Sequence, residues 1–250
     1  MGQCLSPQDP GARLRRAAAK GDVAGVERLL EEGVDADARN ESGSTALHRA
    51  AHWNHAQVCQ ALLQAGCSKD VQNEFGWSAL STAARQGHVQ ACTVLLQAGC
   101  NPDTQDKLGQ SALHAASTHG HPGVVAELLR TACIKDLLTN SGQSALHHAA
   151  AGNQHEVHGE AAYDVINPNQ AVVVSLLLQA KCAADVQDSN GHSPLHVVAQ
   201  GFGDANIVHL LLSAGCSPDL LDAHGKTAYQ LAGPNAQKAF TTQVTEEVPQ

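Results

Sequence analysis

The sequence predicts an all-α solenoid in which short helix-turn-helix units stack on one another and are joined by β-hairpin-like fingers. Two recurring patterns predict this fold. One is a hexapeptide with a leading glycine, such as GSTALH at 43–48, and the other is LLQAGC or a close variant about twenty residues further on. Both recur at a basic interval of 33 residues, with later intervals of 49 and 34, so they mark one structural repeat. The hexapeptides begin at 43, 76, 109, 142, 191 and 225, and the second pattern occupies 62–67, 95–100, 128–133, 177–182 and 211–216.

Each part of the repeat has a local cause. The residue before the first helix is a Ser or Thr, which caps helix N-termini, and Ala or Pro follows it at the first helical position. A pair such as Gly87-His88 then turns the chain into a second helix, which ends at a glycine that favours the left-handed C-cap conformation. A polar segment leads to the next hexapeptide. The expected N-caps are Thr45, Ser78, Ser111, Ser144, Ser193 and Thr227, and the expected C-cap glycines are Gly33, Gly66, Gly99 and Gly215.

A 33-residue period with a T-P-L-H-like tetrapeptide resembles the ankyrin repeat. The resemblance covers residues 11–240 and implies an N-terminal capping repeat at 11–39, five full repeats and a partial C-terminal cap at 222–240. We expect residues 1–10 to form a flexible segment that could carry a lipid anchor, and the polar tail at 241–250 to be disordered. The five full repeats are 40–72, 73–105, 106–138, 139–187 and 188–221.

The repeats depart from the pattern at a few positions. Ser81 replaces the tetrapeptide histidine, while Ala132 and Lys181 replace C-cap glycines. We expect these changes to weaken single turns without changing the fold. The 49-residue interval contains a 16-residue insertion at 154–169, which falls between the two helices of its repeat.

The composition excludes several classes of protein. The chain has 250 residues, 24 acidic against 15 basic, and its net charge of −9 argues against nucleic acid as a partner. Aromatic residues make up only 3%, which favours a core of Ala, Leu and Val. There is no run of 18 apolar residues and no secretory h-region, so we expect a cytoplasmic protein with reduced cysteines. We also expect the protein to be monomeric.

Cysteine and histidine are abundant, but the repeat accounts for most of them. Seven of the eight cysteines occupy two repeat positions, which favours small buried groups over metal ligands, since no C-x-x-C pair occurs. His48 and His52 have the spacing of two metal ligands on a helix, but a hydrogen-bonding role is the favoured interpretation for them. The insertion at 154–169 is rich in His and acidic residues that could bind a metal, but a solvated loop is the favoured interpretation. We expect no metal, no cofactor and no catalytic residue. An enzymatic alternative would need a site in the insertion.

The resemblance also implies a binding face, because ankyrin-like stacks bind proteins on the fingertips and the inner helices. Both tryptophans and one phenylalanine fall at these exposed positions in adjacent repeats, and interface hot spots favour such residues. The alternative is that the tryptophans merely pack between fingers. We expect the hot patch to comprise Trp53, Phe75, Trp77 and Leu108, flanked by Arg49 and Arg85.

The N-terminus MGQCLS matches the M-G-x-x-x-[ST] pattern of N-myristoylation at Gly2. Cys4 is the one cysteine that the repeat does not explain, and a palmitate there would supply the second anchor that stable membrane binding needs. Basic residues follow at once. A chance match, with the basic residues on the solvent face of a capping helix, is the alternative.

These observations together predict a non-enzymatic protein-protein interaction module. It would act as a scaffold, adaptor or inhibitor that holds a signalling or cytoskeletal partner on its concave face. The alternative is an N-acylated adaptor that recruits such a partner to the cytoplasmic face of a membrane. The identity of the protein partner is not encoded in these patterns.

Overall fold

The computed structural model describes residues 9–152, 167–200 and 204–246, and every regular element within them is a helix. The chain divides into two compact units, Met1–Ala112 with Arg130–Cys133, and Leu113–Leu129 with Ile134–Gln250. We call them unit 1 and unit 2. The helices are α1 (Pro10–Lys20), α2 (Val23–Glu31), α3 (Ala46–His52), α4 (Ala56–Gln64), α5 (Ala79–Arg85), α6 (Val89–Gln97), α7 (Ala112–Thr118), α8 (Pro122–Arg130), α9 (Ala145–Ala151), α10 (Asn169–Gln179), α11 (Pro194–Gln200), α12 (Ala205–Ser213), α13 (Ala228–Leu231) and α14 (Pro234–Glu246).

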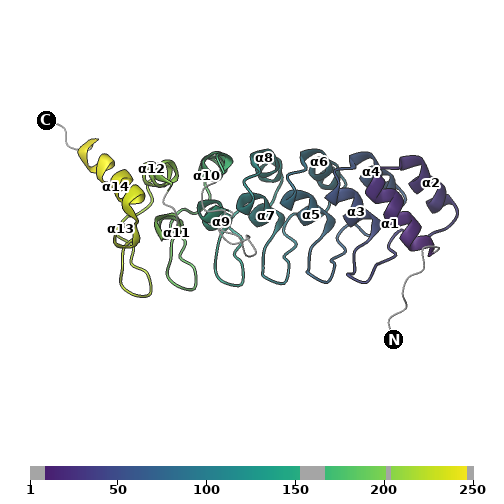
Figure 1. Ribbon diagram of the computed structural model, residues 1–250, viewed down its shortest axis with the longest axis horizontal. Coiled ribbons are helices and arrows are strands. Elements are labelled where there is room, and N and C mark those ends of the chain that lie inside the picture. The colour runs from purple at the N-terminus through teal and green to yellow at the C-terminus, as the bar shows by residue number, and fades with distance from the viewer. Residues whose placement is uncertain (1–8, 153–166, 201–203, 247–250) are drawn as a thin grey trace. The chain divides into compact units, whose positions relative to one another are not determined.

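Unit 1 consists of helix pairs arranged in two rows. Helices α1, α3 and α5 pack side by side next to the fingers, and we call them the finger-side helices. Helices α2, α4 and α6 pack in a second row (Figure 1). The core between the rows is made of Leu and Ala with some Val, as the low aromatic content predicts; Leu47, Leu80, Val58, Leu62 and Leu95 are all buried.

Four of the six predicted N-caps are confirmed. Thr45, Ser78, Ser144 and Thr227 are the N-caps of α3, α5, α9 and α13. The C-cap glycines also have the predicted left-handed conformation, and Lys181 takes the same conformation at φ +59°. A non-glycine residue is strained in this region, which is the local weakening expected of that replacement. The four glycines, Gly33, Gly66, Gly99 and Gly215, have φ between +75° and +86°.

Where the tetrapeptide histidine is present, it ties its repeat to the next finger. The backbone N–H of Thr45 donates to Nδ1 of His48 at 3.2 Å, so the imidazole proton lies on Nε2, which donates to the carbonyl of Trp77 at 2.9 Å. His147 makes the same bridge to the carbonyl of His192 in unit 2. Ser81 keeps the local part of this arrangement, since its Oγ accepts from the N–H of Ser78 at 2.9 Å. Its short side chain cannot reach the next finger.

Adjacent fingers are held together by their backbones. In unit 1 the N–H of Lys107 donates to the carbonyl of Phe75 at 3.3 Å. Gly76 permits this approach, because a Cβ there would lie 2.7 Å from the backbone nitrogen of Lys107, and its φ of +83° also favours glycine. The fingers therefore stack in register through main-chain atoms.

The C-terminal end differs from the sequence prediction. Helix α14 continues through Glu246, six residues into the segment 241–250 that we expected to be disordered. Ala236, Ala239 and Phe240 are buried on this helix, and the ring of Phe240 packs edge-on against Tyr229 at 5.7 Å. These apolar contacts anchor the helix and allow it to extend beyond the expected cap.

The buried histidines make the stability of the fold depend on pH. Burial lowers the pKa of His48 and of His147 below the ordinary value of 6.5. Below pH 6.5 the unfolded chain therefore binds protons that the folded chain does not, and stability falls as the pH falls. As the pH falls from the ordinary pKa of histidine to its pKa in the folded state, we expect each imidazole to lower the free energy of unfolding by up to about 1.4 kcal/mol per pH unit. Urea denaturation at about pH 7.5 and about pH 5.5 measures this loss.

Serine already occupies the equivalent position at Ser81, so His48→Ser with His147→Ser is the matched test. We expect this double variant to be less stable at neutral pH by roughly 1–3 kcal/mol per lost bridge. Its stability should also vary less with pH. An undiminished pH dependence would show that other groups cause it.

Candidate protein-binding surface

The finger at residues 73–77 presents two aromatic rings together. The Asn73 side-chain oxygen accepts hydrogen bonds from the N–H groups of Phe75 and Trp77, both at 3.0 Å, which fixes the turn. The rings of Phe75 and Trp77 lie 5.0 Å apart at an interplanar angle of 30°. Phe75 is 54% exposed and Trp77 is half-buried. The turn thus presents the two rings side by side on one finger of unit 1.

Arg85 joins this finger to the end of α5. Its guanidinium carbon lies 4.9 Å from the centroid of the Trp77 ring, within the range of a cation–π interaction. Three of the six residues predicted to bind a partner, Phe75, Trp77 and Arg85, are therefore in one cluster. The contact also orients a positive charge beside the two rings.

Trp53 and Arg49 belong to a second cluster, at the end of α3. Trp53 is 52% exposed and meets the ring of His52 edge-on at 4.9 Å. Asn54 follows in the left-handed conformation, and its side-chain oxygen accepts from the N–H of Ala91 at 3.2 Å, which fixes the turn. Burial, and then the charge of Arg49, lower the pKa of His52. His52 was not among the six predicted residues, although it occupies the same repeat position as Arg85.

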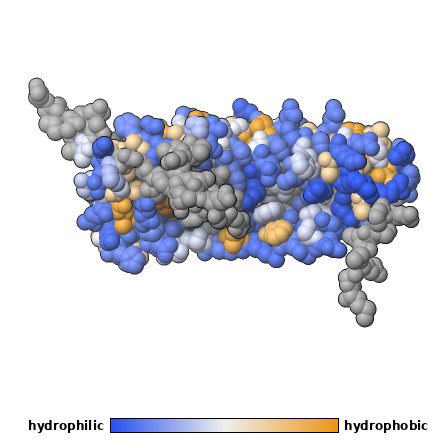
Figure 2. Space-filling view, in the orientation of Figure 1, coloured by the Kyte–Doolittle hydropathy of each residue, from blue (hydrophilic) through white to orange (hydrophobic). Residues whose placement is uncertain are grey.

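Leu108 lies on the next finger and is 65% exposed. The carboxylate of Asp106 accepts from the N–H of Leu108 at 2.9 Å and from that of Gln110 at 2.8 Å, as Asn73 does in the preceding finger. All six predicted residues are in unit 1. Trp53 is too exposed to serve only as packing between fingers, whereas Trp77 packs on its neighbours and remains partly accessible. The face of the molecule in Figure 2 is mostly hydrophilic, with small separate apolar areas.

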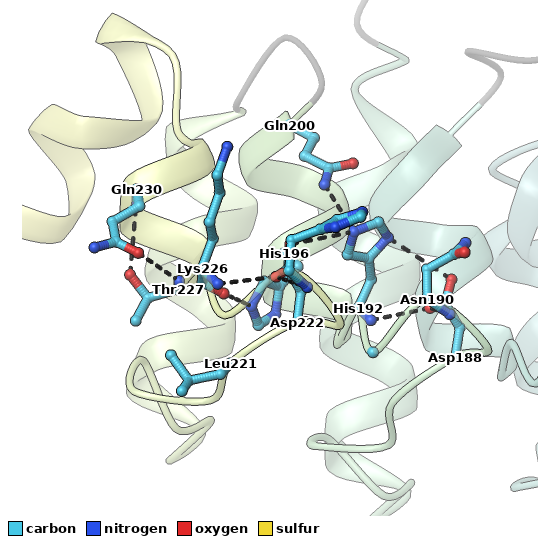
Figure 3. Close-up of polar contacts among 12 residues, drawn as sticks. Asp188, Asn190, His192, His196, Gln200, Leu221, Asp222, Lys226, Thr227 and Gln230 are labelled. Carbon is cyan, nitrogen blue, oxygen red and sulfur yellow. Dashed lines mark hydrogen bonds and ion pairs between the residues drawn. The ribbon is translucent and has the colours of Figure 1, made fainter.

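Unit 2 contains a polar cluster around His192 (Figure 3). Its Nδ1 lies 3.9 Å from a carboxylate oxygen of Asp188, and its Nε2 lies 3.7 Å from one of Asp222. Gln200 points toward the ring and donates to Nε2 at 2.9 Å. The N–H of Lys226 donates to Asp222 at 2.9 Å and is the main cause that lowers the pKa of this carboxyl group. The cluster ties two fingers of this unit together.

The described residues contain no group of three or more His, Cys, Asp or Glu side chains placed to hold a metal ion. Gly2, Cys4 and residues 154–166 of the insertion lie outside the described part of the chain. In the sequence, residues 154–168 of the insertion fall between α9 and α10, and its last residue, Asn169, is the first residue of α10. In the part of the chain that the structure describes, no helix is long and apolar enough to cross a bilayer.

The cysteines at the repeat positions are packing groups. Cys59, Cys67, Cys100 and Cys216 are buried. Burial raises the pKa of Cys67 to about 11 and those of the other three to about 12. Thiols with such pKa values are weak nucleophiles at neutral pH.

Stacked helix pairs and fingers tied by histidine define a helical-repeat protein. Models of the family described as ankyrin repeats match residues 14–106 and 91–158 as three-copy arrays, and residues 177–232 as a many-copy array. The chain belongs to the ankyrin-repeat family.

Similar proteins support the same family. The mouse and human proteins named ankyrin repeat domain-containing protein 40 are 46% identical over 59 residues, which is 23% of this chain. The match spans only 16% of the length of each of these relatives.

Among solved structures, the human ASB11 ankyrin repeat domain has a TM-score of 0.77 at 24% identity and covers 95% of this chain and 98% of its own. The ankyrin repeat domain of Bcl-3, described as a member of the IkappaB family, has a TM-score of 0.75 at 24% identity, covering 92% and 97%. An ankyrin repeat domain from Acinetobacter baumannii has a TM-score of 0.68 at 28% identity, covering 82% and 98%. These similarities show the fold.

Thiol labelling tests the burial of the cysteines. At pH 8 a thiol with a pKa of about 12 is ionised in only about one molecule in 10,000. We expect iodoacetamide to leave Cys59, Cys67, Cys100 and Cys216 unmodified in the native protein and to modify them in urea, as measured by peptide mass spectrometry. The half-buried Cys133 should react faster than these four. Equal rates for Cys59 in native and unfolded protein would contradict its place in the core.

Proposed function

We propose that this protein is a non-enzymatic interaction module, acting as a scaffold, adaptor or inhibitor, that binds a protein partner on the finger-side surface of unit 1. Ankyrin repeats are in general protein-protein interaction modules, and the family assignment supports that class. The observation that carries the specific site is the exposure of Trp53, Phe75 and Leu108, which are each more than half accessible and lie in three consecutive repeats of unit 1. Ile134 and Leu221 of unit 2 are exposed to a similar degree, but both tryptophans of the chain are in unit 1.

The energetics of such a surface favour recognition. Burying an aromatic side chain of this size contributes about 2–3 kcal/mol. Trp and Arg are also the residue types most enriched in interface hot spots. Because Asn54 and Asn73 fix the two turns by hydrogen bonds, the backbone that carries the rings is ordered before a partner arrives, which reduces the entropy lost on binding.

Replacement of Trp53 and Trp77 by alanine tests the surface. We expect Trp53→Ala/Trp77→Ala to lose capture of the partner from cell extract, with each substitution weakening affinity by about 30-fold or more. Quantitative pull-down with mass spectrometry measures this. Leu221→Ala is the control, because Leu221 is an exposed apolar residue of unit 2.

Circular dichroism must show that the variants remain folded, and Trp53→Ala alone serves where the loss of Trp77 packing destabilises the protein. Equal recovery of every partner by wild type and folded variants would refute the assignment of this surface.

A second function, that of an N-acylated adaptor that recruits its partner to a membrane, is favoured by the surface of α1. Arg13, Arg16 and Lys20 are exposed there at spacings of three and four residues, which places them on one stripe of the helix. They closely follow the candidate acylation residues Gly2 and Cys4. Basic residues near an acyl chain strengthen attachment to anionic lipid.

Gly2→Ala tests the membrane proposal. In eukaryotic cells we expect the wild-type N-terminal peptide to carry the mass of an acyl chain and the protein to sediment partly with membranes. Gly2→Ala should lose both properties while it keeps partner capture. An unmodified wild-type N-terminus would refute this second function and leave the first intact.

A further inference from the structure

The finger-side helices of unit 1 are cationic in an otherwise acidic protein. Helices α1, α3 and α5 contain six Lys and Arg residues and no Asp or Glu, whereas the whole chain has a net charge of −9. Five of the six side chains are exposed or half-buried, and only Arg15 is buried. The positive charge is therefore concentrated on this row of helices. The accessible residues are Arg13, Arg16, Lys20, Arg49 and Arg85.

The repeat places these charges side by side. Arg16 and Arg49 are 33 residues apart, so they occupy the same position in α1 and α3, which pack against each other. Lys20 is likewise equivalent to Trp53. Helices in contact lie about 8–10 Å apart, so the two positions are neighbours on the row of finger-side helices.

The carboxylates that flank α1 are already engaged. Asp9 accepts from the N–H of Ala12 at 2.8 Å and pairs with the buried Arg15 at 3.4 Å. Asp22 accepts from the N–H of Gly25 at 2.9 Å. Both are held as helix N-caps, which ties them to the main chain. Neither lies on the finger-side helices themselves.

We infer that the partner segment which binds unit 1 is an acidic peptide with interspersed apolar side chains. This inference rests on the proposed protein-binding function. The carboxylates of such a peptide would lie along Arg16, Arg49 and Arg85, and its apolar side chains would pack on Trp53 and the Phe75–Trp77 pair. From α1 to α5 the surface spans about 16–20 Å, which about six residues of extended chain would cover.

A peptide fits this surface better than a continuous polyanion does. Glu41 and Glu74 are exposed on the fingers, close to the aromatic pair, and would repel a phosphate backbone that passed over them. The guanidinium of Arg85 covers one face of Trp77, where a nucleic acid base would otherwise stack. A peptide can place neutral side chains at these points.

Selection from a random library of peptides about twelve residues long tests this inference, since that length exceeds the span of the surface. With the full-length protein as bait, we expect selected peptides to be enriched in Asp and Glu together with Leu, Phe and Trp. The best of them should bind in fluorescence anisotropy and weaken as NaCl rises from about 50 to about 500 mM. Selection of basic or uncharged peptides would overturn the inference.

Paired variants locate the binding to the cationic helices. We expect Arg16→Gln/Arg49→Gln to weaken the selected acidic peptide by about 10-fold or more. The control is Arg28→Gln, which removes an exposed cation from the second-row helix α2 and should change the affinity little. An equal loss of affinity in Arg16→Gln/Arg49→Gln and in Arg28→Gln would show only a general effect of charge and would overturn the inference. So would tighter binding to phosphatidylserine vesicles or single-stranded DNA than to any selected peptide.

The same selection separates this inference from the proposed function. Peptides that depend on Trp53 and Trp77 but carry no excess of acidic residues would leave the binding surface standing and overturn the acidic partner. Two results together would overturn both the binding surface and the acidic partner. They are that no selected peptide depends on those tryptophans, and that Trp53→Ala/Trp77→Ala captures every partner as well as the wild type does.

Discussion

Every helix pair in this chain depends on its neighbours to bury its apolar face. Leu47 of α3 and Leu62 of α4 are completely or almost completely buried, although the helices that carry them have only seven and nine residues. Isolated helices of that length are marginal in water, so stacking supplies their stability. The bond from His48 to the carbonyl of Trp77 adds direction to this stacking, because it fixes one repeat in register with the next finger. The repeat period in the sequence follows from this constraint.

Stacking also divides the repeat positions into two kinds. Those that face a neighbour hold small or branched side chains in each full repeat, as Ala50, Ala83, Ala116, Ala149 and Val198 do at one position. Those that face solvent at the fingers and at the ends of the finger-side helices carry different residues in each repeat. Trp53 and Arg85 occupy solvent-facing positions of this second kind. Chemistry that is specific to this protein is therefore confined to positions that the fold leaves free.

The sequence predicts the fold well because the signals are local and repeated. A Ser or Thr N-cap and a leucine pair recur in each full repeat, a left-handed C-cap glycine recurs in most of them, and each of these signals has one structural meaning. The contact of Arg85 with Trp77 was not predicted, because it depends on the distance between a finger and the far end of the next helix. The length of α14 was missed for a related reason: Phe240 is buried by tertiary contacts to which the repeat pattern does not extend. The binding residues were predicted from their positions in the repeat. A repeat position indicates whether a side chain is exposed to solvent, but not which other side chains it contacts.

The arrangement at Trp77 shows how stability and recognition can share one residue. The carbonyl of Trp77 accepts the bond from His48 that holds two repeats together, while its side chain contacts Phe75 and Arg85 at the surface. Any residue at this position offers the same carbonyl, so stacking places little restriction on the side chain. The same holds for His192, whose carbonyl accepts from His147 while its ring lies between Asp188 and Asp222. Because the main chain carries the contact between repeats, the side chain that follows each finger glycine can change without loss of the fold, and a binding surface can be built there residue by residue.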